Sequence, residues 1–255
     1  MTPVVNVYPD LERLSRAGVD GFVDSATKTL RDHDEVTVAL SGGHTPIRLY
    51  EILGNEYADR LPWERIQFYW CDERYVSQRD KRSNFGAFHE TLLDRVNIPL
   101  GNVHPMPTYR KDAQKAATDY ERYMRSVFRG DWPIIDMVLL GMGVDGHTAS
   151  LFPYSPVIAE KKRWVVAVET PAEPSTRLTL TLPVLNSASD VGFLVSGEEK
   201  AETLGNILTE PTDVNRFPAS AVRPTNGRLT WRVDEAAFSK TDERYVRGYE
   251  IHRFD

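Results

Sequence analysis

The chain has 255 residues, of which 41% are hydrophobic and 27% charged, and its formal net charge is −6. This composition is typical of a globular domain, and the acidic balance argues against a general nucleic-acid binder, which would need a basic face. Cys71 is the only cysteine, which excludes an intramolecular disulfide and a cysteine cluster for zinc. We see neither a signal-peptide pattern nor an apolar stretch near the ~20 residues of a membrane helix, so we expect a cytoplasmic protein without membrane or nucleic-acid partners.

Strand and helix patterns alternate along the chain. Short apolar or β-branched runs predict strands, and apolar residues repeating every three or four positions predict helices. The repeated strand–helix units predict an α/β protein whose mostly parallel sheet carries helices on both faces. We expect one domain over residues 1–238 and a C-terminal tail, 239–255, whose structure the sequence does not predict. The predicted strands are Val4–Tyr8, Val36–Leu40, Ile66–Trp70, Ile134–Leu140, Trp164–Glu169, Arg177–Thr181, Val191–Val195 and Leu229–Val233; the predicted helices are Asp10–Arg31, a helix that follows Ser41–Pro46 and ends at Leu53, Ser83–Arg95, Asp112–Phe128, Glu198–Leu208 and Asp234–Phe238.

The first candidate site is the loop Ser41-Gly42-Gly43-His44-Thr45-Pro46, which lies between a predicted strand and a predicted helix. Thr45 is a favourable N-cap, and Pro46 suits the first helical position. The two glycines leave backbone N–H groups uncovered at the positive end of the helix, and two hydroxyl side chains add donors, which suits a phosphate. An ordinary tight turn is the alternative. The loop matches neither a Walker motif nor a G-x-G-x-x-G fingerprint, so nucleotide binding is not indicated.

Three further groups of charged residues lie at the ends of predicted strands, where sheet ligands usually bind. Asp72-Glu73-Arg74 follows one strand, although a solvated loop is the more ordinary interpretation of three adjacent charges. Lys200, in Gly197-Glu198-Glu199-Lys200, follows another, and its ammonium could neutralise a phosphate. The alternative for Lys200 is an exposed helix lysine. Arg177 opens a third strand and lies beside two hydroxyl side chains. The alternative interpretation of Arg177 is an ordinary arginine on an edge strand.

The most informative stretch is Gly141-Met142-Gly143-Val144-Asp145-Gly146-His147-Thr148-Ala149-Ser150-Leu151-Phe152-Pro153, which follows the apolar run Ile134–Leu140. Its three glycines allow a sharp turn and a close approach to a ligand. An acid and an imidazole, Asp145 and His147, lie two residues apart in that turn. A purely structural turn would need one glycine and no titratable pair, so we interpret this stretch as the chemical centre of the protein.

Together these motifs resemble those of the 6-phosphogluconolactonases. The resemblance implies a modified Rossmann-like α/β fold, shared with glucosamine-6-phosphate deaminases and ribose-5-phosphate isomerases. It also implies a hydrolase that needs no cofactor and no metal, and whose partner is a small phosphorylated sugar lactone. The oligomeric state stays open between a monomer and a small homo-oligomer. The matching residues, from Ser41 to Ser220, are Ser41–Pro46, Asp72–Arg74, Ser83-Asn84, Gly141–Pro153, Arg177-Leu178-Thr179, Gly197 with Lys200, and Pro218-Ala219-Ser220.

The reaction implied by the resemblance is the hydrolysis of 6-phospho-D-glucono-1,5-lactone to 6-phosphogluconate in the oxidative pentose phosphate pathway. His147 would act as the general base toward water, and either Asp145 or Asp72 would orient its imidazole. Backbone N–H groups of Gly141–Gly146, with the charge of Arg74, would stabilise the oxyanion. The phosphate would be held by the Ser41–Thr45 loop (Ser41, Gly42, Gly43, His44 and Thr45), by Lys200 and by Arg177.

Two alternatives to a lactonase remain at this point. The related deaminase and isomerase enzymes carry a glutamate just before the proline of the last motif, where this chain has Phe152 before Pro153. A phenyl ring cannot relay a proton, so Phe152 favours the lactonase. A non-catalytic regulator that binds sugar phosphates is the second alternative. Such a regulator would keep the phosphate-binding residues but would not need Asp145 and His147.

Overall fold

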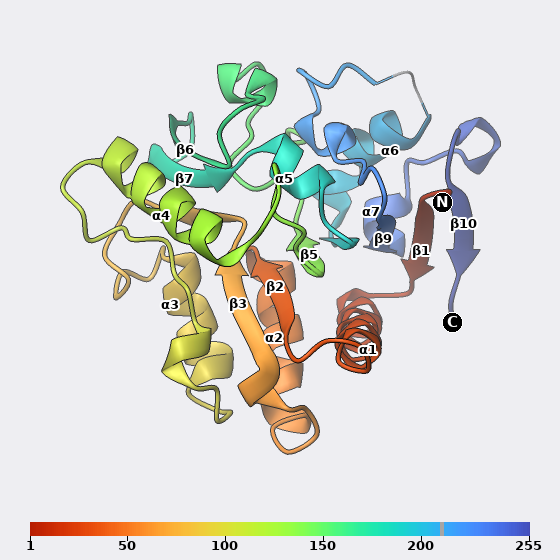
Figure 1. Cartoon of the computed structure of the whole chain (residues 1–255). Helices are drawn as coiled ribbons and strands as arrows, with labels where there is room; N and C mark the ends of the chain where they lie inside the picture. Colours follow the sequence, from red (N-terminus) through yellow and green to blue (C-terminus); the bar gives the residue numbers. More distant parts are fainter. Residues whose placement is uncertain (210–211) are drawn as a thin grey trace.

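The computed structural model describes residues 1–209 and 212–255, and over these ranges it contains a seven-stranded and a three-stranded sheet (Figure 1). The large sheet has the strand order β10-β1-β9-β8-β5-β2-β3, and all its neighbouring strands are parallel. The α/β prediction is therefore confirmed. The strands of this sheet are β1 (Val4–Tyr8), β2 (Val36–Leu40), β3 (Ile66–Trp70), β5 (Met137–Leu140), β8 (Asp190–Val195), β9 (Arg228–Asp234) and β10 (Glu250–Arg253).

Helices cover the sheet and bury its apolar runs. Gly18 of α1 has the side chains of Leu49 of α2 and Leu194 of β8 directly above its Cα, so the two helices pack together on that face. No helix of the described residues is long and apolar enough to cross a membrane. The helices are α1 (Leu11–Thr29), α2 (His44–Glu56), α3 (Asn84–Phe88), α4 (Ala113–Val127), α5 (Leu182–Asn186), α6 (Ala201–Thr209) and α7 (Glu235–Phe238), with short helical turns η1 (Trp63–Arg65), η2 (His89–Leu93), η3 (Leu100–Asn102), η4 (Pro156–Ala159), η5 (Glu198–Lys200), η6 (Pro218–Ala221) and η7 (Glu243–Tyr245).

The three-stranded sheet differs from the sequence prediction. It consists of β4 (Asp72–Arg74), β7 (Thr176–Leu180) and β6 (Val165–Glu169), and both of its strand pairs are antiparallel. We expected β6 and β7 as strands of a protein with one mostly parallel sheet, and a solvated loop was the more ordinary interpretation of the β4 residues. Residues about 100 positions apart pair in β4 and β7, and no local pattern reports such a pairing.

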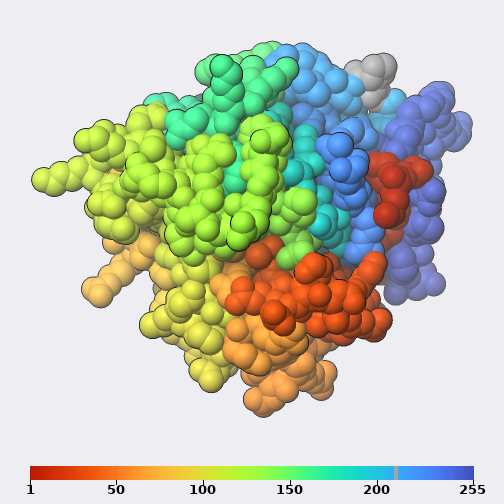
Figure 2. Space-filling view, in the orientation of Figure 1, coloured from red at the N-terminus to blue at the C-terminus, as the bar shows by residue number. Residues whose placement is uncertain are grey.

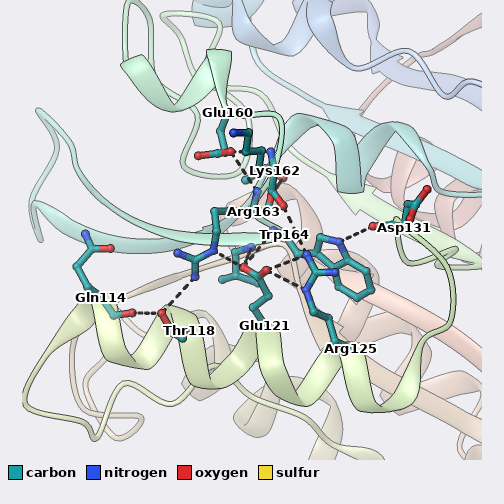
Figure 3. Close-up of polar contacts among 11 residues, drawn as sticks. Gln114, Thr118, Glu121, Arg125, Asp131, Glu160, Lys162, Arg163 and Trp164 are labelled. Carbon is teal, nitrogen blue, oxygen red and sulfur yellow. Dashed lines mark hydrogen bonds and ion pairs between the residues drawn. The ribbon is translucent and has the colours of Figure 1, made fainter.

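The small sheet is joined to α4 by a buried carboxylate, that of Glu121 (Figure 3). This carboxylate accepts hydrogen bonds from the guanidinium groups of Arg125 and Arg163, and from the backbone N–H groups of Trp164 and Val165 at the start of β6. The guanidinium of Arg125 also lies over the indole ring of Trp164, 4.2 Å from its centre. One acidic side chain therefore anchors the small sheet to the helix beside it.

The C-terminal residues extend the large sheet beyond residue 238, where we expected the domain to end. Strand β10 pairs in parallel with β1, and the ring of Phe254 stacks on that of Tyr8 with centroids 4.9 Å apart. Figure 2 shows the two ends of the chain side by side on one face of the molecule. The sequence of this segment has no strong strand pattern, so its pairing with the N-terminal strand depends on the sheet already present.

Candidate active site

The predicted site segments meet in one cavity at the carboxyl ends of β2, β3, β5 and β8. The cavity has a volume of about 260 Å³. These four strands are consecutive in the parallel sheet, in the order β8-β5-β2-β3, so the loops that follow them reach the same side. All the predicted site residues line the cavity except Asp145, which contacts one of them: the lining includes Ser41, Gly42, Gly43, His44, Thr45, Asp72, Arg74, His147, Arg177 and Lys200.

The imidazole of His147 is oriented by Asp145. The Nδ1–H group of His147 donates a hydrogen bond of 2.6 Å to Oδ1 of Asp145, because a carboxylate can only accept. Nε2 is then the unprotonated nitrogen of the neutral ring. Burial raises the pKa of Asp145, but the hydrogen bonds and charge of His147 outweigh that effect and hold the pKa below its usual value. Of the two carboxylates that the sequence left as candidates, Asp145 is the one in contact with the imidazole.

The turn that carries this pair is held at several points. The N–H of Gly143 donates to the carbonyl of His147 at 2.8 Å, and Gly146 adopts a φ of 83°, which favours glycine. From α6, the hydroxyl of Thr203 donates to the carbonyl of Val144 at 2.6 Å. The N–H groups of Gly143 and Gly146 are used inside the turn, so these two of the backbone donors that we expected within Gly141–Gly146 are not available to an oxyanion.

Asp72 lies on a buried strand and not in a solvated loop. Its Oδ2 accepts a hydrogen bond of 2.6 Å from the hydroxyl of Ser150, and its Oδ1 accepts one of 3.2 Å from Nδ2 of Asn84. Only 5% of Asp72 is exposed, and its neighbour Glu73 is more deeply buried. Glu73 accepts N–H groups at the start of α3, and burial raises its pKa. Asp72 therefore faces the cavity, whereas Glu73 anchors the helix.

Arg74 and Arg177 lie opposite each other on β4 and β7. The guanidinium of Arg177 is held by a 2.7 Å hydrogen bond from Nε to the carbonyl of Pro174. Burial lowers the pKa of Arg177, and the nearby charge of Asp72 opposes that shift. Arg74 donates through Nη1 to the carbonyl of Arg82, while its buried Nε has no hydrogen-bond partner among the described residues. Two adjacent guanidinium groups therefore give this wall of the cavity a positive charge.

The glycine loop after β2 presents the start of α2 to the cavity. The N-cap is Gly43, with a φ of 107°, and helix α2 begins at His44. Our placement of the N-cap at Thr45 and the first helical residue at Pro46 is therefore wrong. The positive φ of Gly43 lets the chain enter the helix earlier. No side chain of the described residues caps this end of α2, and its first turn carries no acidic residue. Its free N–H groups are a suitable environment for an anion.

Lys200 ends the helical turn η5 after β8, and its ammonium is about half buried. Burial lowers its pKa, while the charges of Glu199 and Asp145 oppose the shift. The preceding residue Gly197 is held by the carboxylate of Asp234, which accepts its N–H at 3.1 Å. The cavity thus has cationic groups on two walls, on η5 and on the small sheet.

Three polar side chains that line the cavity were not among the predicted site residues: Asn84, Ser196 and Glu199. Glu199 lines the cavity beside Lys200. In the sequence it looks like an ordinary exposed glutamate of a helix, so its charge gave no sign of a place in the site. Asn84 also lines the cavity and packs on the glycine loop: a β-carbon on Gly42 would lie 1.9 Å from Oδ1 of Asn84. The pair Ser83-Asn84 was among the matching motifs, but its residue types alone did not indicate a place in the site. Among the described residues, no group of three His, Cys, Asp or Glu side chains is arranged to hold a metal ion.

The chain is similar to known proteins in both sequence and structure. Residues 9–231 match the family model described as glucosamine-6-phosphate isomerases/6-phosphogluconolactonase. The chain is 39% identical to a 6-phosphogluconolactonase of Synechocystis over 240 residues, which are 93% of this chain and 98% of the relative. The crystal structure of a 6-phosphogluconolactonase from Thermotoga maritima superposes with a TM-score of 0.78 at 34% identity, covering 91% of this chain and 99% of that one. A 6-phosphogluconolactonase from Trypanosoma brucei gives 0.85 at 28% identity, with coverages of 93% and 98%.

Proposed function

The chain belongs to the family of glucosamine-6-phosphate isomerases and 6-phosphogluconolactonases, and we propose that it hydrolyses 6-phospho-D-glucono-1,5-lactone to 6-phosphogluconate. The observation that carries the proposal is the Asp145–His147 pair beside a cavity with cationic walls. An imidazole whose Nδ1 is held by a carboxylate offers Nε2 as a base near neutral pH. A cavity with free N–H groups and cationic side chains suits an anionic substrate.

The phosphate of the lactone binds at the start of α2 and against Lys200. The support for this step is the uncapped first turn after Gly43, together with an ammonium on the neighbouring loop. Arg177 adds positive charge from the small sheet. Binding the phosphate at one end of the cavity holds the lactone carbonyl near His147, so the reaction gains from fixed orientation.

The chemical step begins when Nε2 of His147 takes a proton from water. The water oxygen forms a bond to C1 of the lactone, and the carbonyl oxygen becomes an oxyanion. Arg74 is the group we assign to stabilise that charge, because its cationic side chain lines the cavity beside Arg177. The C1–O5 ring bond then breaks, and the ring oxygen takes the proton from the imidazolium of His147. The product acid ionises and releases one proton to solvent.

The reaction is tested by titrating the released acid at constant pH with freshly made 6-phosphogluconolactone, after correction for spontaneous hydrolysis. We expect strong acceleration by the wild-type protein and a loss of about 10²–10⁴-fold in His147→Ala, the usual contribution of a positioned base. Near wild-type turnover by correctly folded His147→Ala would remove that residue from the mechanism. Binding of 6-phosphogluconate without any lactone turnover would instead support the non-catalytic regulator.

A further inference from the structure

The ring of Phe152 lies flat against the imidazole of His147. The two ring centres are 4.1 Å apart and the planes differ by 17°. Phe152 is 4% exposed, so its ring is a fixed part of the protein interior. The imidazole is therefore held by two kinds of contact, a hydrogen bond from its edge to Asp145 and a stacked ring on its face.

The backbone on both sides of Phe152 is strained. Ala149 has a φ of 47° and Tyr154 a φ of 58°, which are the only positive values for non-glycine residues within the described ranges. Left-handed conformations at such residues cost free energy and persist only where neighbouring contacts enforce them. Here Thr148 donates its hydroxyl to the carbonyl of Gly141 at 2.8 Å, and the N–H of Tyr154 donates to a neighbouring loop. The two turns bring the ring of Phe152 back over His147.

We propose that Phe152 is a positioning residue for His147. The hydrogen bond to Asp145 and the backbone of Gly143 restrain the imidazole near Nδ1, but the ring can still tilt about its Cβ–Cγ bond. The stacked phenyl ring removes that freedom and fixes the plane in which Nε2 lies. When Nε2 takes a proton, the resulting imidazolium faces the negative face of the phenyl ring, an arrangement that stabilises a cation. This second effect rests on the proposed lactonase function, whereas the orientation of the ring does not.

Kinetics of Phe152→Leu and of a matched control test the proposal. Leucine keeps an apolar side chain but removes the flat ring. We expect kcat to fall roughly 10- to 100-fold, the order of loss for a reacting group misplaced by about 1 Å, with KM nearly unchanged because the phosphate-binding groups are untouched. The control is Phe193→Leu, which removes a similar buried stack, that of Phe193 on Trp231 with centres 3.9 Å apart. It should lower stability but leave kcat unchanged.

A readout independent of activity is the nitrogen NMR spectrum of His147 in the unliganded protein. In the wild type we expect one tautomer with the proton on Nδ1. In Phe152→Leu we expect a mixture of tautomers or broadened signals, and in Phe152→Tyr, which keeps the ring, a return of the wild-type spectrum and most of kcat. The other charged or titratable groups around the cavity are the same in all variants, so a change in the spectrum reports the loss of the stacked ring. These groups are His44, Asp72, Arg74, Asp145, Arg177, Glu199 and Lys200.

Three outcomes would overturn the proposal. One is a wild-type spectrum and wild-type kcat in folded Phe152→Leu. Another is an equal loss of kcat in Phe193→Leu. If Phe152→Leu does not fold, Phe152→Met replaces it, since methionine fills a similar volume without a flat ring. The third outcome that would overturn the proposal is a wild-type spectrum of His147 in Phe152→Met. If the wild-type protein fails to hydrolyse the lactone, the proposed function fails, but the spectra still decide whether Phe152 orients His147.

Discussion

The backbone of Gly143 lies directly against the imidazole of His147. A β-carbon on Gly143 would be 2.1 Å from Nδ1 of His147 and 2.6 Å from Oδ1 of Asp145. Real β-carbons essentially never come closer than 3.0 Å to a heavy atom outside their own and the adjacent residues. The absence of a side chain at this position is therefore a steric requirement of the Asp145–His147 pair.

Gly143→Ala should inactivate the protein about as strongly as His147→Ala. The added methyl group must displace either the imidazole or the carboxylate, so the base loses its orientation, and a loss of about 10²-fold or more follows. Lactone hydrolysis by the folded variant is the measurement. Gly101→Ala is the matched control, since a β-carbon there meets nothing within 4 Å. Retention of activity in Gly143→Ala would show that the pair tolerates displacement.

Lys200→Ala should weaken binding of phosphorylated substrate far more than it affects unphosphorylated gluconolactone. The ammonium acts as a point charge toward the phosphate, and the unphosphorylated lactone has no such group. The test compares kcat/KM for both lactones in wild-type and variant proteins. Equal losses on the two substrates would argue that Lys200 supports the cavity without contacting the phosphate.

Binding of phosphorylated ligands should weaken at alkaline pH sooner than an ordinary lysine would predict. Burial lowers the pKa of Lys200 below its usual value of 10.5, so the positive charge is present at low pH and is lost as pH rises through that lowered pKa. The phosphate is already fully ionised there, so it contributes no further change. Calorimetric titration with 6-phosphogluconate from pH 7 to 10 measures the effect. Lys200→Arg, which keeps its charge, should show a flatter profile; identical profiles would contradict the assignment.

The protein should release no ammonia from glucosamine 6-phosphate. Opening a pyranose ring needs a group that relays a proton, and Phe152 stacks on His147 where it can neither donate nor accept one. Phe152→Glu alone should not create deaminase activity, because the other ring-opening groups must also be placed to about half an ångström. Ammonia release by the wild-type chain, at a rate comparable with lactone hydrolysis, would favour the deaminase alternative.

Glu121→Gln should lower the free energy of unfolding by about 1–3 kcal/mol, because neutral glutamine leaves two arginines without their charged acceptor. Burial raises the pKa of Glu121, but hydrogen bonds from Arg163 and Arg125 outweigh it and lower that pKa. The charged Glu121 carboxylate therefore stabilises the protein fully at pH values above its pKa in the unfolded chain, about 4.3. This stabilisation is lost as the pH falls through the lower pKa that Glu121 has in the folded protein. Urea unfolding at pH 7 and pH 3.5 should show the difference between the two proteins shrinking in acid. If the difference in unfolding free energy between the two proteins is the same at both pH values, the effect of Glu121→Gln comes from packing alone.

The sequence by itself identified most strands, the parallel character of the large sheet and the loops that line the cavity. Each of these depends on short-range physics. An apolar run such as Ile66–Trp70 must be buried, and glycines after such a run permit a turn and a close approach. Parallel strands deliver their following loops to one edge, so local patterns placed each candidate loop where ligands usually bind. That His147 and Lys200 share one site was implied by the family resemblance of the motifs.

Only the tertiary structure decided which groups contact each other there. Asp145 and Asp72 were equivalent as candidates until Ser150 and Asn84 were seen to bind Asp72, leaving Asp145 for His147. The burial of β4 depends on pairing with β7, and the place of β10 depends on an open edge at β1. Such contacts join residues far apart in the chain, whose proximity follows from how the whole core packs and leaves no periodic signal in the local sequence.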